Sequence, residues 1–167
     1  LHPPEAGFFS QALALNQAGQ ALVSAGGQTP WALWSGDRLR PLRGARADAA
    51  LSIHALSDDG EVAGAYDGWA ARGRPPGMAR LRSLSGTNDA IAHGLQGAVA
   101  VGMSYQRMMW NGVERRFRRA VRWVDGSPVD ITPPGVPEAT ALAVGGSGMI
   151  TGWAQTPDQS RSHAWLW

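Results

Sequence analysis

Short apolar runs separated by turns recur in the same order along the chain. The clearest copy is the last, residues 139–167: an alternating apolar run, a turn ending in Gly148, a second run closed by Gly152, a polar loop, and a final run from His163 to Trp167. Two sets of residues match across the copies: the turn glycines are Gly19, Gly60, Gly97 and Gly148, and the third runs end at Trp34, Leu81, Trp123 and Trp167. This spacing predicts a unit of about 40 residues that is present four times.

Each unit has the dimensions of a propeller blade, because four runs of roughly four to six residues are typical of short antiparallel strands. We expect an all-β, propeller-like array of four blades with four short antiparallel strands each. The array is predicted to form a single domain, 1–167, with repeats at about 11–43, 50–84, 90–131 and 139–167. The segment Leu1–Ser10 begins with Leu-His-Pro-Pro, which resembles Ile131–Pro134 between two repeats. It is expected either to end a preceding repeat or to supply the strand that the fourth repeat lacks, which would close the ring.

Turn residues place the first hairpin of each unit. Residues 16–19 and 57–60 begin with Asn or Ser and end in Gly, the pattern of a type I turn, and residues 94–97 and 145–148 keep the final Gly. Two units are irregular. In the second, residues 66–77 are predicted as a loop and Met78–Leu81 as the third strand. In the third, Tyr105–Arg119 is an insertion, where the spacing of Phe117, Ala120, Val121 and Val124 leaves a short helix as an alternative to a strand.

Composition narrows the chemistry that is open to the chain. The 167 residues include 22 glycines and 11 prolines and are 44% hydrophobic, which favours a folded domain rich in turns. There is no cysteine, and all 15 basic residues are arginine. Disulfides, thiol nucleophiles, Schiff-base chemistry and lysine-dependent phosphate loops are therefore excluded. No apolar run approaches the roughly 18 residues that a membrane-spanning segment needs.

The repeat unit resembles a known bacterial family. The segments that carry the resemblance are Ala12–Val23 and His163–Trp167, which are similar to the extracellular HAF-type repeat named for its His-Ala-Phe tripeptide, with Trp165 standing in place of Phe. The resemblance covers nearly the whole chain outside the insertion. It implies a propeller-like fold and export to the periplasm or the cell exterior of a bacterium, and it implies no assigned activity.

Residues that could support catalysis or metal binding follow the repeat or the turns. No two histidines lie three to five residues apart, as the ligands of a zinc site often do. The histidines are His2, His54, His93 and His163. Asp58 and Asp59 occupy a turn in which Asp caps the backbone, and Asp67 and Asp130 have no evident partner carboxylate. Residues 145–152 only approach a dinucleotide fingerprint and are predicted as a hairpin turn. We therefore predict no enzyme activity, no metal site and no cofactor.

Tryptophans divide into two groups. Those on third strands, expected to fill the space between blades, are Trp31, Trp34, Trp123, Trp165 and Trp167. Three others lie in or beside predicted loops, where an indole can stack on a sugar or anchor a partner: Trp69, Trp110 and Trp153. Packing of these loops is the alternative for the second group.

The insertion is the most basic part of the chain. Between Arg107 and Arg122 there are six arginines and one acidic residue, Glu114, a local charge of +5 in a chain whose net charge is +2. Such a patch fits an acidic protein surface, an acidic polysaccharide or an anionic membrane face better than nucleic acid, for which no motif is present. Solvated arginines without a partner are the alternative. The predicted partner-binding residues are Arg107, Trp110, Arg115, Arg116, Phe117, Arg118, Arg119, Trp69 and Trp153.

These observations predict a structural or accessory module without catalytic activity. Its expected role is protein–protein interaction within a larger exported assembly, because loops of unequal length stand on a repetitive scaffold. A glycan-binding module of the cell surface is the alternative, and a polysaccharide-active enzyme is less favoured.

Overall fold

The protein is an all-β protein built from four antiparallel sheets. The computed structural model describes residues 10–25, 31–42, 51–74, 77–86, 89–158 and 160–167, and within these ranges it contains strands and no helix. The prediction of an all-β chain with several small antiparallel sheets is confirmed. The predicted ring-closing segment, Leu1–Ser10, lies outside the described residues except for Ser10.

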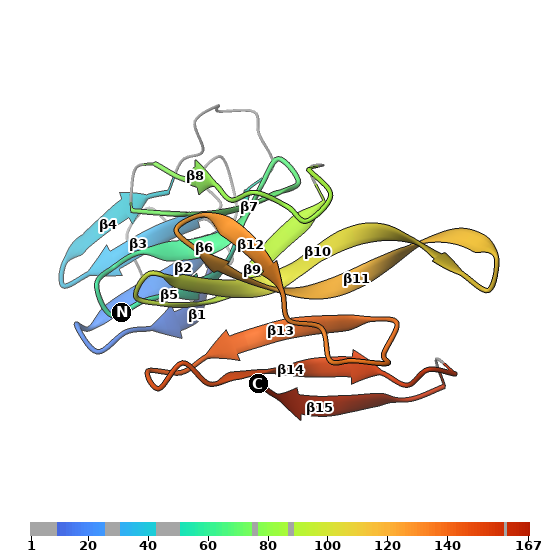
Figure 1. Cartoon of the computed structure of the whole chain (residues 1–167). Coiled ribbons are helices and arrows are strands. Elements are labelled where there is room, and N and C mark those ends of the chain that lie inside the picture. Colours follow the sequence, from blue (N-terminus) through green and yellow to red (C-terminus); the bar gives the residue numbers. More distant parts are fainter. Residues whose placement is uncertain (1–9, 26–30, 43–50, 75–76, 87–88, 159) are drawn as a thin grey trace.

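Every sheet is a meander of strands that are consecutive in the sequence (Figure 1). Sheet 1 contains β1 (Ser10–Leu15), β2 (Gln20–Ala25), β3 (Trp31–Ser35) and β4 (Arg38–Pro41). Sheet 2 contains β5 (Leu51–Leu56), β6 (Val62–Tyr66), β7 (Trp69–Gly73) and β8 (Ala79–Arg80). Sheet 3 contains β9 (Ala90–Gln96), β10 (Val99–Trp110), β11 (Val113–Val124) and β12 (Ser127–Asp130), and sheet 4 contains β13 (Ala139–Val144), β14 (Ile150–Gln155) and β15 (Ser162–Leu166).

The sheets pack face to face in chain order around three apolar cores. Leu22 and Ile53 meet between sheets 1 and 2, Ala63 and Trp123 meet between sheets 2 and 3, and the core between sheets 3 and 4 contains Ile150. Sheets 2 and 3 are therefore covered on both faces, which explains the fully buried run of β6. Among the described residues no core joins sheet 4 back to sheet 1, so a closed ring is not seen.

The first strand of each sheet bends at the same place. A register shift separates Ala12 from Ala14, Ile53 from Ala55, Ala92 from Gly94, and Ala141 from Ala143. Each shift leaves one extra residue in the first strand, as in a β-bulge. The four bulged residues are Leu13, His54, His93 and Leu142.

The bulges explain glycines in the second strands of three sheets. A Cβ atom added to Gly64, Gly102 or Gly152 would lie 1.9–2.0 Å from a backbone carbonyl oxygen of the first strand. Only glycine allows this close approach of two strands.

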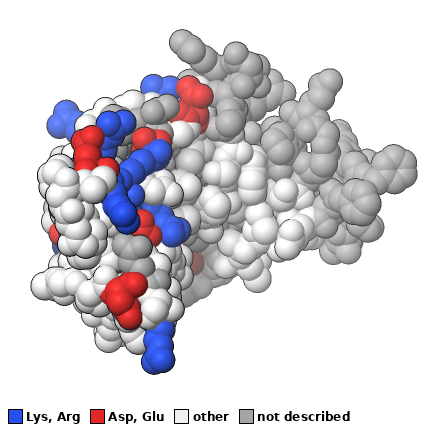
Figure 2. All heavy atoms as spheres, turned by 90° about the vertical axis from the view of Figure 1, so that its right-hand side faces the viewer, with Lys and Arg blue, Asp and Glu red and all other residues white. Residues whose placement is uncertain are grey.

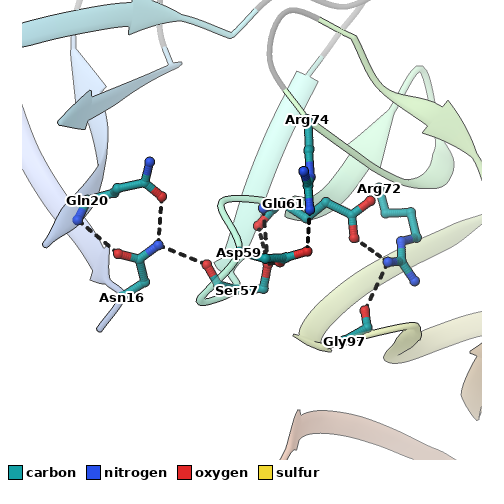
Figure 3. Close-up of polar contacts among 8 residues, drawn as sticks. All are labelled: Asn16, Gln20, Ser57, Asp59, Glu61, Arg72, Arg74 and Gly97. Atoms are coloured by element: carbon teal, nitrogen blue, oxygen red, sulfur yellow. Dashed lines mark hydrogen bonds and ion pairs between the residues drawn. The ribbon is translucent and has the colours of Figure 1, made fainter. Parts of the chain in front are cut away.

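Turns beside the first strands connect sheets 1, 2 and 3 in series (Figure 3). Asn16 Nδ2 donates a hydrogen bond to the carbonyl oxygen of Ser57, 2.9 Å away in the matching turn of sheet 2. Arg72 pairs with Glu61 in sheet 2 and donates to the carbonyl oxygen of Gly97, 2.9 Å away in sheet 3. Apolar packing between these sheets is therefore supplemented by polar contacts between the turns at their ends.

The predicted four-residue turns are confirmed in three of the sheets. The amide of Gly19, Gly60 or Gly148 donates to the carbonyl three residues earlier, and each of these glycines has a positive φ. The prediction for residues 94–97 is wrong, because Gly94 to Gln96 continue β9 and a two-residue turn follows at 97–98. Leu95 is buried in the core, which keeps this segment in the strand.

Three further predictions are corrected. Residues 66–77 contain a strand, β7, because Asp67 and Gly68, both at positive φ, form a tight turn that returns the chain along β6. Met78–Leu81 therefore contributes the fourth strand of sheet 2, not the third. The helix alternative for 117–124 is also wrong, since β11 spans Val113–Val124.

Candidate functional site

A two-stranded arm extends from sheet 3. β10 and β11 pair over their whole length, from Val99 opposite Val124 to Trp110 opposite Val113. Their sheet partners are shorter, because β9 pairs with β10 only as far as Ser104 and β12 pairs with β11 only as far as Val121. Residues 105–119 therefore leave the sheet as a hairpin, which we call the arm, and Figure 1 shows it projecting beyond the other sheets.

The tip of the arm is a tight two-residue turn. Asn111 and Gly112 have φ values of 51° and 77°, as in the turns that match the twist of paired strands. An Asn-Gly pair between apolar residues is a strong hairpin signal in a sequence, and it would have predicted this tip. The turn fixes the register of the arm and with it the residues that the tip exposes.

Exposed apolar side chains lie next to this turn. Met109 is 66% exposed and Val113 is 55% exposed. Trp110 is half-buried and packs edge to face on Phe117, with ring centroids 5.6 Å apart. Phe117 itself is buried, so it supports Trp110 instead of lying on the surface as a contact residue. The sequence analysis did not select Met109 and Val113.

Carboxylates from other elements pair with most of the arginines of the arm. Arg116 lies 2.7 Å from Asp89, Arg118 lies 3.3 Å from Glu138, and Arg107 lies 3.8 Å from Glu114. Nearer the sheet, Arg119 lies 3.0 Å from Asp130. Figure 2 shows positive and negative side chains intermingled on the face toward which the arm points.

These pairs reduce the positive charge that the sequence predicts. Six arginines between residues 107 and 122 face Glu114, Asp89, Asp130 and Glu138, so the local charge is about +2 and not +5. Arg115 forms no ion pair with any described residue. Arg122 also forms no ion pair with a described residue, but it lies opposite Val101 in the sheet and stacks on Trp167. Arg115, opposite Met108, is therefore the arginine of the arm that has no described ion pair.

Arginines also stack on aromatic rings around the arm. The guanidinium of Arg116 lies 3.9 Å from the centroid of the Tyr105 ring, and that of Arg118 lies 4.7 Å from Trp153. Trp153 is in the middle of β14, not in a loop. Trp69 begins β7, where Arg80 covers its ring at 5.6 Å. These cation–π contacts occupy ring faces that a sugar would use.

A cavity of about 380 Å³ lies at the base of the arm. It is lined by Ser85, Asp89, Tyr105, Gln106, Arg107 and Arg116. This lining offers both hydrogen-bond donors and acceptors, as a site for a polar ligand with hydroxyl groups would need.

Two histidines meet at the contact between sheets 2 and 3. The bulged residues His54 in β5 and His93 in β9 have ring centroids 5.1 Å apart, with the rings inclined by 65°. Burial lowers the pKa of His54. Burial, and then repulsion from His54, lowers the pKa of His93 to about 4. Sequence spacing could not reveal the pair, because the two residues come from different units.

We expect the stability of the fold to decrease between about pH 6.5 and pH 4. An unfolded histidine has its usual pKa of about 6.5, so the unfolded state binds the proton first and unfolding is favoured as the pH falls. The loss is about 1–2 kcal/mol, because both rings are partly solvated. Urea unfolding between pH 7.5 and 4.5 measures this loss of unfolding free energy. The carboxyl groups of Asp59 and Asp158, whose pKa values are lowered, affect stability mainly below this range.

Two variants separate the histidine pair from other titrating groups. His93→Gln should flatten this dependence, whereas His163→Gln, at an exposed position on β15, should leave it unchanged. If the unfolding free energy changes with pH equally in the wild-type protein and in His93→Gln, the histidine pair is not the cause of the pH dependence.

Among the residues that the structure describes, no three His, Cys, Asp or Glu side chains come together as a metal site. None of the described segments forms a helix that is long and apolar enough to cross a membrane. No known protein family matches the chain, and no curated protein sequence is significantly similar to it. The resemblance to the HAF-type repeat stays a prediction.

Proposed function

We propose that this chain is a non-catalytic binding module that docks on another protein through the arm, as part of a larger exported assembly. The observation that carries this proposal is the arm itself, whose tip exposes Met109 and Val113. These side chains belong to none of the three cores formed by the described residues. Met109 lies opposite Glu114 and Val113 opposite Trp110, so they expose apolar surface on both faces of the tip, and exposed apolar surface can mark an interaction site.

The scaffold in this proposal is a propeller-like array. The first strands of consecutive sheets contact each other, β1 with β5, β5 with β9, and β9 with β13, as the innermost strands of a propeller do. The resemblance to the HAF-type repeat supports both the propeller-like arrangement and export. On such a scaffold a single long hairpin is an addition to the common blade, which favours a specific role for it.

The charges of the arm indicate what kind of partner it fits. Arg115 is unpaired among the described residues, and Arg107 has only a distant partner in Glu114 at 3.8 Å. Arginine and aromatic side chains beside exposed apolar groups are enriched at protein interfaces. The complementary surface is an apolar groove with carboxylates along its rim, in which Met109 and Val113 would be buried.

A matched pair of double variants tests this function. The chain is used to capture its partner from cells of its source, the captured protein is purified, and its affinity is measured by calorimetry. Met109→Asp with Val113→Asp should weaken binding at least tenfold, because the charges would enter an apolar groove. Met149→Asp with Val129→Asp changes two residues of similar exposure, 53% and 50%, outside the arm and should leave binding unchanged. Equal weakening by both pairs would indicate non-specific adhesion and contradict the proposal.

Glycan binding is the alternative outcome of the same test. The cavity of about 380 Å³ favours it, since Arg107 could pair with the carboxylate of an acidic sugar while Gln106 and Asp89 bind its hydroxyl groups. The chain is also tested for retention on a column of acidic polysaccharide. If the Met109→Asp, Val113→Asp variant is retained and Arg107→Ala is not, glycan binding is the function and not protein docking. Cleavage of the polysaccharide by the purified chain would contradict both binding functions and indicate an enzyme.

A further inference from the structure

The bulges of β5 and β9 direct two imidazole rings toward each other. His54 and His93 are the extra residues of their strands, and bulges often re-aim a side chain at a functional site. The matching bulged residues of β1 and β13 are leucines, Leu13 and Leu142. The two histidines are therefore specific to the middle pair of sheets and not a feature of every sheet.

The separation of the rings fits a shared metal ion. Zinc and related ions bind an imidazole nitrogen at about 2 Å, and the nitrogen lies about 1.2 Å from the ring centre. Two imidazoles bound to one ion at a tetrahedral angle therefore have ring centres about 5 Å apart. The observed separation is 5.1 Å. His54 Nε2 lies 3.2 Å from Ser52 Oγ. In the tautomer whose Nε2–H donates to this hydroxyl, Nδ1 carries the lone pair that can bind a metal ion, and the hydrogen bond holds the ring in place.

We propose that His54 and His93 together bind one divalent transition-metal ion, Cu²⁺ more tightly than Zn²⁺, with water in the remaining coordination positions. The order follows the general affinity of nitrogen ligands for divalent metals. No third His, Cys, Asp or Glu among the described residues joins the pair, so the ion keeps open positions. This site is independent of the arm, and its failure would leave the proposed docking function untouched.

Calorimetric titration of the full chain with CuSO₄ and with ZnCl₂ at pH 7.5 tests the site. His2 lies outside the described residues and is replaced by Gln in every protein used, so that it cannot contribute to copper binding. We expect one Cu²⁺ per chain, and at least tenfold weaker binding in His54→Gln and in His93→Gln. His163→Gln is the control and should bind as the parent protein does.

Electron paramagnetic resonance of the copper-loaded parent protein gives a readout that needs no variant at the site. Hyperfine coupling to two imidazole nitrogens is expected, and it distinguishes the pair from a single histidine even where a variant at His93 fails to fold. A spectrum that shows coupling to one nitrogen overturns the proposal. So does a titration in which no copper binds at a protein concentration on the order of 100 micromolar. Binding that persists in both His54→Gln and His93→Gln, or that is lost in His163→Gln, also overturns it.

Discussion

Gly102→Ala is expected to destabilise the protein by about 3 kcal/mol or more. The new Cβ would lie 2.0 Å from the carbonyl oxygen of Ile91 and 2.9 Å from Cα of Ala92. Both are backbone atoms of β9, and sheet 3 is packed between sheets 2 and 4, so neither strand can move away without disturbing a core. Chemical unfolding followed by tryptophan fluorescence measures the loss.

Gly146→Ala is the matched control for this substitution. A Cβ at Gly146 would meet nothing within 4 Å, and its φ is not in the positive range, so the change should be within about 0.5 kcal/mol. In sheet 1 the equivalent position, opposite Ala12, is occupied by Val23, so the close approach of the strands and not the bulge alone requires glycine in sheets 2 and 3. A loss of less than 1 kcal/mol in Gly102→Ala would contradict the close approach of β9 and β10.

Local sequence signals predicted most of the strands and three of the four turns. Gly19, Gly60 and Gly148 were predicted at turn ends, where their positive φ values and hydrogen bonds place them. These features depend on residues within four positions of each other. The third turn was mispredicted because Gly94 looked like a turn residue, although the buried Leu95 next to it keeps the strand intact.

Contacts between residues that are far apart in the chain could not be predicted from the sequence. The arm was delimited as an insertion at 105–119, but Asp89, Asp130 and Glu138, which neutralise much of its charge, come from segments outside it. The approach of His54 to His93 likewise depends on how two sheets pack. A β-bulge changes the alternation of apolar residues very little. The register shifts were therefore not predicted, and the glycines in the second strands had no evident explanation.

Trp123→Ala is expected to cost about 3–5 kcal/mol of unfolding free energy, because a large buried side chain is removed and the site cannot fully collapse. Trp123 is 1% exposed in the core between sheets 2 and 3, and its Nε1 donates to the carbonyl oxygen of Arg82. Trp123→Phe should lose less, since the ring still packs while the hydrogen bond is lost. Urea unfolding of the three proteins gives the order.

Trp167→Ala distinguishes this burial from a general role of third-strand tryptophans. The sequence matched Trp167 with Trp123, but Trp167 is 52% exposed, and its described ring contact is the guanidinium of Arg122 at 5.4 Å. The register gives the two residues equivalent positions, because Trp123 lies opposite Ala100 and Trp167 opposite Ile150, each two residues before the bulge glycine of its sheet. The difference lies in the neighbouring strand: β12 flanks Trp123, whereas β15 is the edge of sheet 4 among the described strands. Trp167→Ala should therefore cost only about 0.5–1 kcal/mol; a loss equal to that of Trp123→Ala would show that the end of sheet 4 is packed as tightly as the core.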